Sequence, residues 1–167
     1  KGHSAITAYP GSPLIVARLR RPDDRLVLME TLPKEASALE AALGRQRQVS
    51  VIEGDGYAAL KAQLPPREKR GLVLIDPPYE SDLEFDRVLA GLELAHERWP
   101  MGTYCVWYPL TDRAGPVRFH RGLERSGIRR VLDVRLGVLP PDAQVGMAGA
   151  GLVIVNPPWQ LDERLKE

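Results

Sequence analysis

Short apolar runs recur along the chain and alternate with longer segments that have a helical pattern. Six such runs predict β-strands, at residues 25–30, 49–53, 71–75, 102–108, 131–139 and 151–155. The run at 131–139 alternates less cleanly than the others, whereas residues 72–75 and 152–155 are apolar throughout. Continuous apolar runs are typical of strands buried on both faces of a parallel sheet, so the pattern predicts a sheet covered by helices.

Helical patterns fill the intervals between most of these strands, at residues 12–19, 33–43, 56–64, 81–99 and 116–126. In the first of them, Ser12 is predicted to be the N-cap and Pro13 the first helical residue. The alternation of helices and strands predicts right-handed βαβ units and a doubly wound α/β sheet. No helix separates the last two strands, so we expect them to pair antiparallel at a sheet edge.

Composition narrows the class of protein. Of the 167 residues, 44% are hydrophobic and 27% are charged, which argues against disorder and fits a single domain over residues 1–167. No apolar run reaches the roughly 20 residues that cross a bilayer, and a lone cysteine, Cys105, cannot form an internal disulfide. We therefore expect a cytoplasmic protein. The net charge is only +1, so a nucleic-acid surface would require local segregation of charge.

The residues that follow the predicted strands are the first candidates for chemistry, because open α/β sheets bind ligands at the carboxyl ends of their strands. The tetrapeptide Asp76-Pro77-Pro78-Tyr79 is the most informative of them. Consecutive prolines keep the backbone extended and rigid, so they fix the Pro77 carbonyl beside the Asp76 carboxylate. Two acceptors beside an aromatic face suit a planar base with an exocyclic NH2, whose lone pair they steer toward an electrophile. The alternative is a strand that ends in a proline-rich turn.

Four segments in this order resemble the 23S ribosomal RNA adenine-N6 methyltransferase family of the RlmJ type, which uses S-adenosylmethionine. They read Tyr-Pro-Gly-Ser-Pro-Leu-Ile at 9–15, Gly-Leu-Val-Leu-Ile-Asp-Pro-Pro-Tyr-Glu at 71–80, Trp-Tyr-Pro at 107–109 and Val-Ile-Val-Asn-Pro-Pro-Trp at 153–159. The resemblance implies a Rossmann-like methyltransferase sheet with helices on both faces, and N6-methylation of an adenine in 23S rRNA. A DNA adenine-N6 methyltransferase would share the tetrapeptide, and a non-catalytic RNA-binding fragment is the alternative from another class.

The resemblance also implies roles for single positions. Asp76 is the implied proton acceptor, within a catalytic segment formed by Asp76, Pro77, Pro78 and Tyr79. The implied contacts to S-adenosylmethionine are Ser12, Glu30, Asp55, Gly56 and Asp76. Among these, Glu30 would accept from the ribose hydroxyls, and the carboxylate of Asp55 would accept from the adenine amine. The alternative for Glu30 and Asp55 is N-capping of the helix that follows, worth about 1 kcal/mol each.

A second segment, from Asn156 to Trp159, also fits the consensus of an Asp or Asn, two prolines and an aromatic residue. Glu30 and Asp55 precede Asp76 at one strand interval each, which is the order expected around a cofactor. Asn156 instead follows the last strand, which we place near the sheet edge. We therefore assign catalysis to Asp76 and interpret Asn156 as a wall of the substrate pocket or as a structural stop.

Part of the family pattern is missing from this chain. Family members carry an upstream strand with a Gly-rich loop for the methionine portion of the cofactor, histidines near the N-terminus and a helical insertion. The chain therefore resembles the C-terminal two-thirds of an enzyme, and the missing strand would lie between the strands that end at Glu30 and Ile75. We expect this chain alone to bind S-adenosylmethionine weakly and to show no turnover.

Positive charge gathers in one region. Residues 111–135 contain seven arginines and three acids, and the spacing of Arg118, Arg121 and Arg125 places them on one helical face. Such a stripe predicts contacts with the phosphates of 23S rRNA, and the alternative is a solvated helix face. His3, His96, His120 and Cys105 have no metal-ligand spacing, so no metal is expected.

Overall fold

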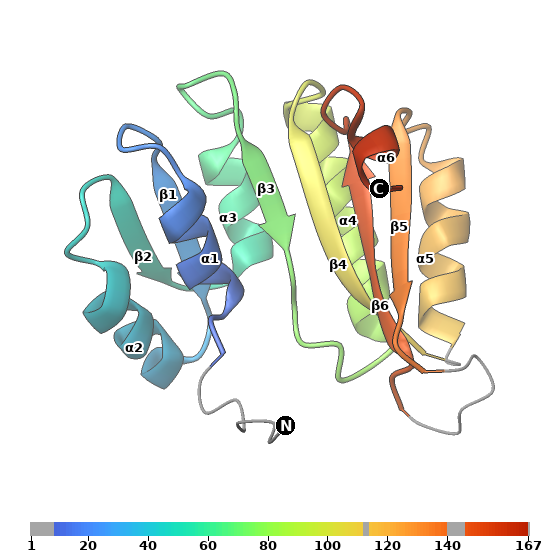
Figure 1. The fold of residues 1–167 in the computed structure, drawn as a ribbon, viewed down its shortest axis with the longest axis horizontal. Helices are drawn as coiled ribbons and strands as arrows, with labels where there is room; N and C mark the ends of the chain where they lie inside the picture. Colours follow the sequence, from blue (N-terminus) through green and yellow to red (C-terminus); the bar gives the residue numbers. More distant parts are fainter. Residues whose placement is uncertain (1–8, 112–113, 140–145, 167) are drawn as a thin grey trace, which may run out of the picture. The chain divides into compact units, whose positions relative to one another are not determined.

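The computed structural model describes residues 9–111, 114–139 and 146–166. Helices and strands alternate through most of these residues, in the order that Figure 1 shows, and this confirms the predicted α/β class. The chain divides into two compact units, Lys1–Ala59 and Leu60–Glu167, which are described separately. Within the described ranges, no helix has the length and apolar character needed to cross a membrane.

Unit 1 contains a small parallel sheet. Its elements are α1 (Ser12–Leu19), β1 (Leu26–Glu30), α2 (Pro33–Leu43) and β2 (Val49–Glu53). β1 and β2 pair in parallel, from Leu26 opposite Val49 to Glu30 opposite Glu53. The crossover helix α2 buries Ala36 and Leu43. Because the strands are parallel, both deliver the residues that follow them to the same edge of the sheet. The chain continues into α3 (Gly56–Gln63).

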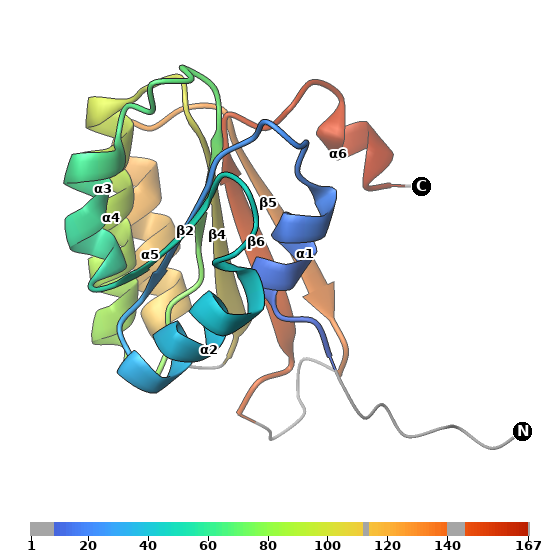
Figure 2. The same cartoon turned by 90° about the vertical axis from the view of Figure 1, so that its left-hand side faces the viewer.

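Unit 2 contains the larger sheet. Its elements are β3 (Leu72–Ile75), α4 (Leu83–Arg98), β4 (Thr103–Leu110), α5 (Ala114–Arg125), β5 (Val131–Gly137), β6 (Gly149–Val155) and α6 (Leu161–Arg164). The strand order is β3-β4-β6-β5, with β3 and β4 parallel and β6 antiparallel to both neighbours. Figure 2 shows α4 and α5 on one face of this sheet. Among the described residues, no strand pair joins it to the sheet of unit 1.

The core of unit 2 lies between this sheet face and the two helices. Alternate residues of β4, namely Tyr104, Val106 and Tyr108, point into it and are fully buried, as expected from the two-residue period of a strand. Gly151 of β6 lies opposite Tyr108, and a Cβ at that position would overlap the Tyr108 ring. Glycine therefore makes room for a large aromatic residue near the carboxyl end of β4.

The structure corrects the predicted start of the first helix. Gly11, not Ser12, is the N-cap of α1, and no side chain makes a capping hydrogen bond there. The backbone amides of Leu14 and Ile15 both donate to the Gly11 carbonyl, at 3.1 and 3.2 Å. Because the N-cap carbonyl accepts the first hydrogen bond of a helix, Ser12 is the first helical residue. The prediction was wrong by one position.

The end of the chain confirms one expectation and sharpens another. β5 and β6 pair antiparallel as predicted, from Val131 opposite Val155 to Gly137 opposite Gly149. β5 is the edge strand, whereas β6 is paired on both sides, with β4 and β5. The last strand is thus one position inside the edge. α5 begins at Ala114, two residues before the predicted start.

Candidate active site

The segment Asp76–Tyr79 leaves the sheet of unit 2 at the carboxyl end of β3, beside β4. Ile75, the last residue of β3, is buried, whereas Asp76 is exposed. Tyr79 folds back toward β4: its hydroxyl donates to the Trp107 carbonyl at 2.6 Å, and its ring lies 4.5 Å from the Phe85 ring of α4. The aromatic end of the segment is thereby anchored, and its acidic end faces solvent.

Two acceptors in this segment receive no hydrogen bond from the residues that the structure describes. Among the described residues, no N–H or O–H donates to the Asp76 carboxylate or to the Pro77 carbonyl. The next carbonyl along the chain, that of Pro78, accepts from the Glu80 amide at 2.9 Å. A carboxylate and a rigid carbonyl on adjacent residues are thus both available to a ligand that carries N–H groups.

The environment of this segment raises the pKa of three side chains. Neighbouring protein atoms remove part of the hydration of Asp76 although it reaches solvent, and this raises the pKa of its carboxyl. Burial raises the pKa of Cys105, and the charge of Asp76 raises it further. Burial, followed by the charges of Asp76 and Glu84, also raises the pKa of Tyr79. Tyr79 therefore remains a hydrogen-bond donor at neutral pH.

Glu30 is the last residue of β1 and Asp55 follows β2, so both come to the same edge of the parallel sheet of unit 1. Each carboxylate accepts from a backbone amide two residues later, Glu30 Oε1 from Leu32 at 2.9 Å and Asp55 Oδ1 from Tyr57 at 2.9 Å. The Asp55 bond reaches the second residue of α3 and is the capping interaction that we considered as the alternative. The Glu30 bond instead reaches Leu32, the N-cap of α2, where no side chain caps the helix, so it fixes the turn before α2 and the capping alternative is wrong for Glu30. In the described part of the chain, the second oxygen of Glu30 accepts no hydrogen bond.

The predicted residues thus form two groups, one in each unit. Unit 1 brings together Glu30 and the Asp55-Gly56 pair, and Ser12 begins α1 in the same unit. The catalytic segment lies in unit 2. A carboxylate with an unused oxygen at the end of β1, next to a second acid at the end of β2, has the acceptors that a ribose and an amino group require.

Asn156 takes no part in either group. β6 runs antiparallel to β4, so its last residue, Val155, lies opposite Tyr104 near the start of β4, whereas Asp76 follows the carboxyl end of the parallel strand β3. The Asn156 amide donates to the Pro100 and Gly102 carbonyls, at 2.8 Å each. The interpretation as a pocket wall was wrong because the strand is reversed, and the interpretation as a structural stop is confirmed.

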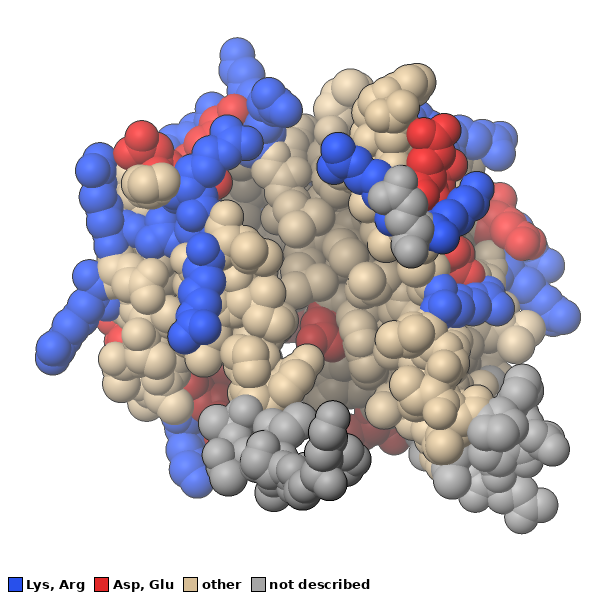
Figure 3. Space-filling view, in the orientation of Figure 1, with Lys and Arg blue, Asp and Glu red and all other residues tan. Residues whose placement is uncertain are grey.

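The arginines of α5 differ in their surroundings. Arg118 pairs with Asp86 of α4 at 3.1 Å and donates to the Asp82 carbonyl at 2.9 Å, so it joins the two helices. Arg121 and Arg125 are exposed and have no polar partner among the described residues. Figure 3 shows Lys and Arg side chains over the side of the molecule that carries α5 and β5. Arg121 and Arg125 are therefore the members of the stripe that remain available to a ligand.

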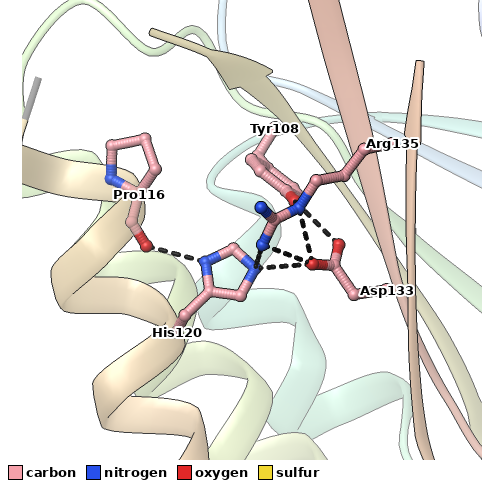
Figure 4. Close-up of polar contacts among 5 residues, drawn as sticks. All are labelled: Tyr108, Pro116, His120, Asp133 and Arg135. Carbon is pink, nitrogen blue, oxygen red and sulfur yellow. Dashed lines mark hydrogen bonds and ion pairs between the residues drawn. The ribbon is translucent and has the colours of Figure 1, made fainter. Parts of the chain in front are cut away.

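A polar network around Asp133 escaped the sequence analysis (Figure 4). Asp133 accepts from the Tyr108 hydroxyl at 2.7 Å and from Arg135 Nε at 2.8 Å, and it lies 3.2 Å from His120 Nε2. His120 Nδ1 is 2.7 Å from the Pro116 carbonyl, which can only accept, so Nδ1 carries a hydrogen. Burial and the Asp133 hydrogen bond raise the pKa of Tyr108. Asp133 and Arg135 alternate with apolar residues in β5, and that pattern was the available signal.

The candidate groups contain no metal centre. Within residues 9–111, 114–139 and 146–166, no group of three or more His, Cys, Asp or Glu side chains could hold a metal ion. The residues that gather at strand ends are instead hydrogen-bond acceptors and aromatic rings.

Comparison with known proteins places this arrangement in a family. The family model described as "Ribosomal RNA large subunit methyltransferase D, RlmJ" matches residues 1–167. The chain is 42% identical over 166 residues to ribosomal RNA large subunit methyltransferase J of Haemophilus influenzae. The match covers 99% of this chain but only 59% of that protein. The chain thus spans less than two thirds of the length of this relative.

Solved structures agree with the sequence comparison. A crystal structure of a Legionella pneumophila protein matches with a TM-score of 0.86 and 37% identity, over 95% of this chain and 58% of that one. A precorrin-6y methyltransferase from Geobacter metallireducens matches with a TM-score of 0.53 and 15% identity, over 80% of this chain and 67% of that one. The second likeness shows the α/β fold alone. The chain belongs to the RlmJ family of ribosomal RNA large subunit methyltransferases.

Proposed function

We propose that the protein transfers a methyl group from S-adenosylmethionine to the N6 amine of an adenine in 23S rRNA. The observation that carries this proposal is the pair of unclaimed acceptors at the end of β3, the Asp76 carboxylate and the Pro77 carbonyl. An adenine N6 amine has two hydrogens, and one acceptor for each would hold the amine in place. No other pair of adjacent residues at a strand end of unit 2 combines a carboxylate with a rigid carbonyl in the described ranges.

These residues would act mainly by orienting the N6 amine toward the methyl group. The lone pair of N6 is delocalised into the purine ring, so hydrogen bonds to both N–H groups favour a pyramidal nitrogen. Asp76 would accept one hydrogen and take up the proton released when the N–C bond forms. Pro78 would keep the carbonyl of Pro77 from rotating, and the ring of Tyr79 would stack on the base. Holding the reacting atoms in line supplies much of the rate enhancement in such reactions.

The cofactor would bind chiefly through unit 1. Bound S-adenosylmethionine supplies an electrophilic methyl group on a sulfonium sulfur. Glu30 would accept from ribose hydroxyls through the oxygen that its bond to the Leu32 amide leaves unused, and Asp55 and Gly56 would contact the adenine. Ser12 would contribute a hydroxyl from the first residue of α1. A base inside an RNA stack cannot reach a carboxylate at a sheet edge, so the target adenine must be unpaired or flipped out.

The test is a methyl-transfer assay with the full-length protein. Labelled S-adenosylmethionine would be incubated with deproteinised 23S rRNA and, in parallel, with duplex DNA, and the product would be digested to nucleosides. We expect label in N6-methyladenosine from the rRNA and background from the DNA. Label only in DNA, or on an atom other than N6, would overturn the proposal. Glu93→Ala, an exposed acid on α4 far along the chain from the tetrapeptide, is the control for nonspecific loss of activity.

A further inference from the structure

Unit 2 has a cavity whose lining does not include the catalytic segment Asp76–Tyr79. It has a volume of about 320 Å³ and lies between the carboxyl end of β4 and α5. Leu110, Pro116 and Val117 form an apolar wall, and Arg121, Glu124 and Arg135 contribute charge. This volume falls at the small end of the roughly 300–1,000 Å³ typical of ligand sites.

The charged groups of this cavity are only partly used by the protein. Arg121 and Glu124 are exposed and, within the described ranges, neither has a polar partner. Arg135 binds Asp133 through Nε and Nη2. Its Nη1 donates no hydrogen bond to any residue that the structure describes. The cavity therefore offers two guanidinium groups with spare donors and one carboxylate with spare acceptors.

The Asp133 network holds one wall of the cavity in place. It ties Tyr108 of β4 and Arg135 of β5 to a single carboxylate. His120 bonds the Pro116 carbonyl in the first turns of α5 through Nδ1, and its Nε2 lies 3.2 Å from the same carboxylate (Figure 4). The ring of His120 stands edge-on to that of Tyr108, with 5.1 Å between centroids. A wall fixed by such a network loses little conformational entropy when a ligand binds.

We propose that this cavity binds a nucleotide of the substrate RNA other than the methylated adenine. Guanidinium groups recognise phosphate, an apolar wall accepts the face of an unstacked base, and a carboxylate accepts from the N–H groups of a base edge. The presence of Glu124 argues against a bare phosphate as the ligand, because its charge would repel one. The inference rests on the proposed function and deepens it, since it names a second contact that positions the RNA.

Three single substitutions in the full-length protein distinguish RNA binding in this cavity from a general electrostatic attraction of RNA to α5. Arg121→Gln removes a charge that lines the cavity, and Arg125→Gln removes the same charge from the same helix outside it. Val117→Trp fills the cavity without a change in charge, at a side chain that is 51% exposed and therefore tolerant of size. The measurements are kcat and KM for 23S rRNA, and the affinity for a fluorescent single-stranded RNA by anisotropy at several salt concentrations.

The pocket predicts that Arg121→Gln and Val117→Trp each raise KM and the RNA dissociation constant roughly tenfold, with kcat within about twofold of wild type. Arg125→Gln should raise both quantities by a smaller factor than Arg121→Gln, because it removes only the general attraction between the arginine stripe and RNA phosphates. Equal effects of Arg121→Gln and Arg125→Gln, or no effect of Val117→Trp, would overturn the inference. If the wild-type protein methylated no rRNA, the proposed function would fail, and the anisotropy measurement would still decide whether the cavity binds RNA.

Discussion

The chain carries the same short pattern twice, and the two copies do different things. Asp76–Tyr79 and Asn156–Trp159 both consist of an Asp or Asn, two prolines and an aromatic residue after an apolar strand. The first places an exposed carboxylate and a rigid carbonyl at the carboxyl end of β3, and no described residue donates to either of them. The second uses its amide to bind the Pro100 and Gly102 carbonyls, at 2.8 Å each, and its aromatic residue, Trp159, is 86% exposed.

Strand direction explains the difference. β3 and β4 are parallel, so residues that follow β3 emerge at the end of the sheet where ligands bind in open α/β folds. β6 is antiparallel to β4, so residues that follow it emerge at the other end, where they meet the loop that enters β4. The pattern is therefore informative about function only when the direction of its strand is known.

The largest expected effect is on catalysis, from Asp76→Ala. This change removes one of the two acceptors for the target amine, so methyl transfer should fall by ~10²-fold or more, while the dissociation constant for S-adenosylmethionine stays within a few fold. Initial rates with labelled cofactor and isothermal titration calorimetry provide the two measurements. Turnover near that of wild type would remove Asp76 from the catalytic role.

The second largest effect is on cofactor affinity, and it tests whether Glu30 binds the cofactor or only holds the turn before α2. Glu30→Ala removes a carboxylate that would accept from two ribose hydroxyls, and we expect cofactor binding in the full-length protein to weaken by about 2–4 kcal/mol. Glu53→Ala is the matched control, because Glu53 ends the neighbouring strand in register with Glu30. An unchanged dissociation constant for the Glu30 variant would leave Glu30 only its bond to the Leu32 amide in the turn before α2.

Asn156→Ala should reduce stability and leave the chemistry alone. It deprives two carbonyls of their donor, and Asn156 has a φ of 51°, a left-handed conformation that Asn adopts more readily than Ala. We expect the free energy of unfolding to fall by about 1–3 kcal/mol in urea titrations. Turnover per folded molecule should match wild type, and a specific loss of turnover would return Asn156 to the substrate site.

The smallest expected effect is on the pH dependence of the free energy of unfolding, and it comes from the partly buried charge of Asp76. Burial raises its pKa in the folded protein above the unfolded value of about 3.9, so the folded state binds more protons than the unfolded state. Stability should therefore decrease as pH rises from the unfolded pKa through the raised one. Asp76→Asn has no such charge, so at neutral pH it should unfold at higher urea than wild type despite its loss of activity. An advantage that is the same at every pH would contradict this cause.

Local sequence signals located most of the fold. The apolar runs predicted β1, β2 and β3 to within a residue, because each of these short strands has a polar or glycine residue on both sides. The order of acids after successive strands placed Glu30 and Asp55 at one sheet edge. These inferences depend on contacts within a few residues or on the parallel βαβ rule.

Apart from local errors at helix starts, the features that the sequence did not reveal depend on distant partners. Arg118 was assigned to a stripe with Arg121 and Arg125, but its actual partners are Asp86 of α4 and Asp82, the N-cap of that helix. The Asp133 network joins three elements, and the position of β6 inside the sheet depends on its pairing with β4. Helical spacing and strand alternation describe one element at a time, so they do not identify such pairings.

The most direct test compares the two proline segments in one assay. Full-length wild-type protein, Asp76→Asn and Asn156→Ala would be given 23S rRNA and labelled S-adenosylmethionine, and the initial rate of N6-methyladenosine formation would be divided by the folded fraction of each protein. The amine-holding role of Asp76 predicts a rate for Asp76→Asn reduced ~10²-fold or more, and a rate for Asn156→Ala equal to that of wild type. Equal losses in both variants, or a loss confined to Asn156→Ala, would contradict it.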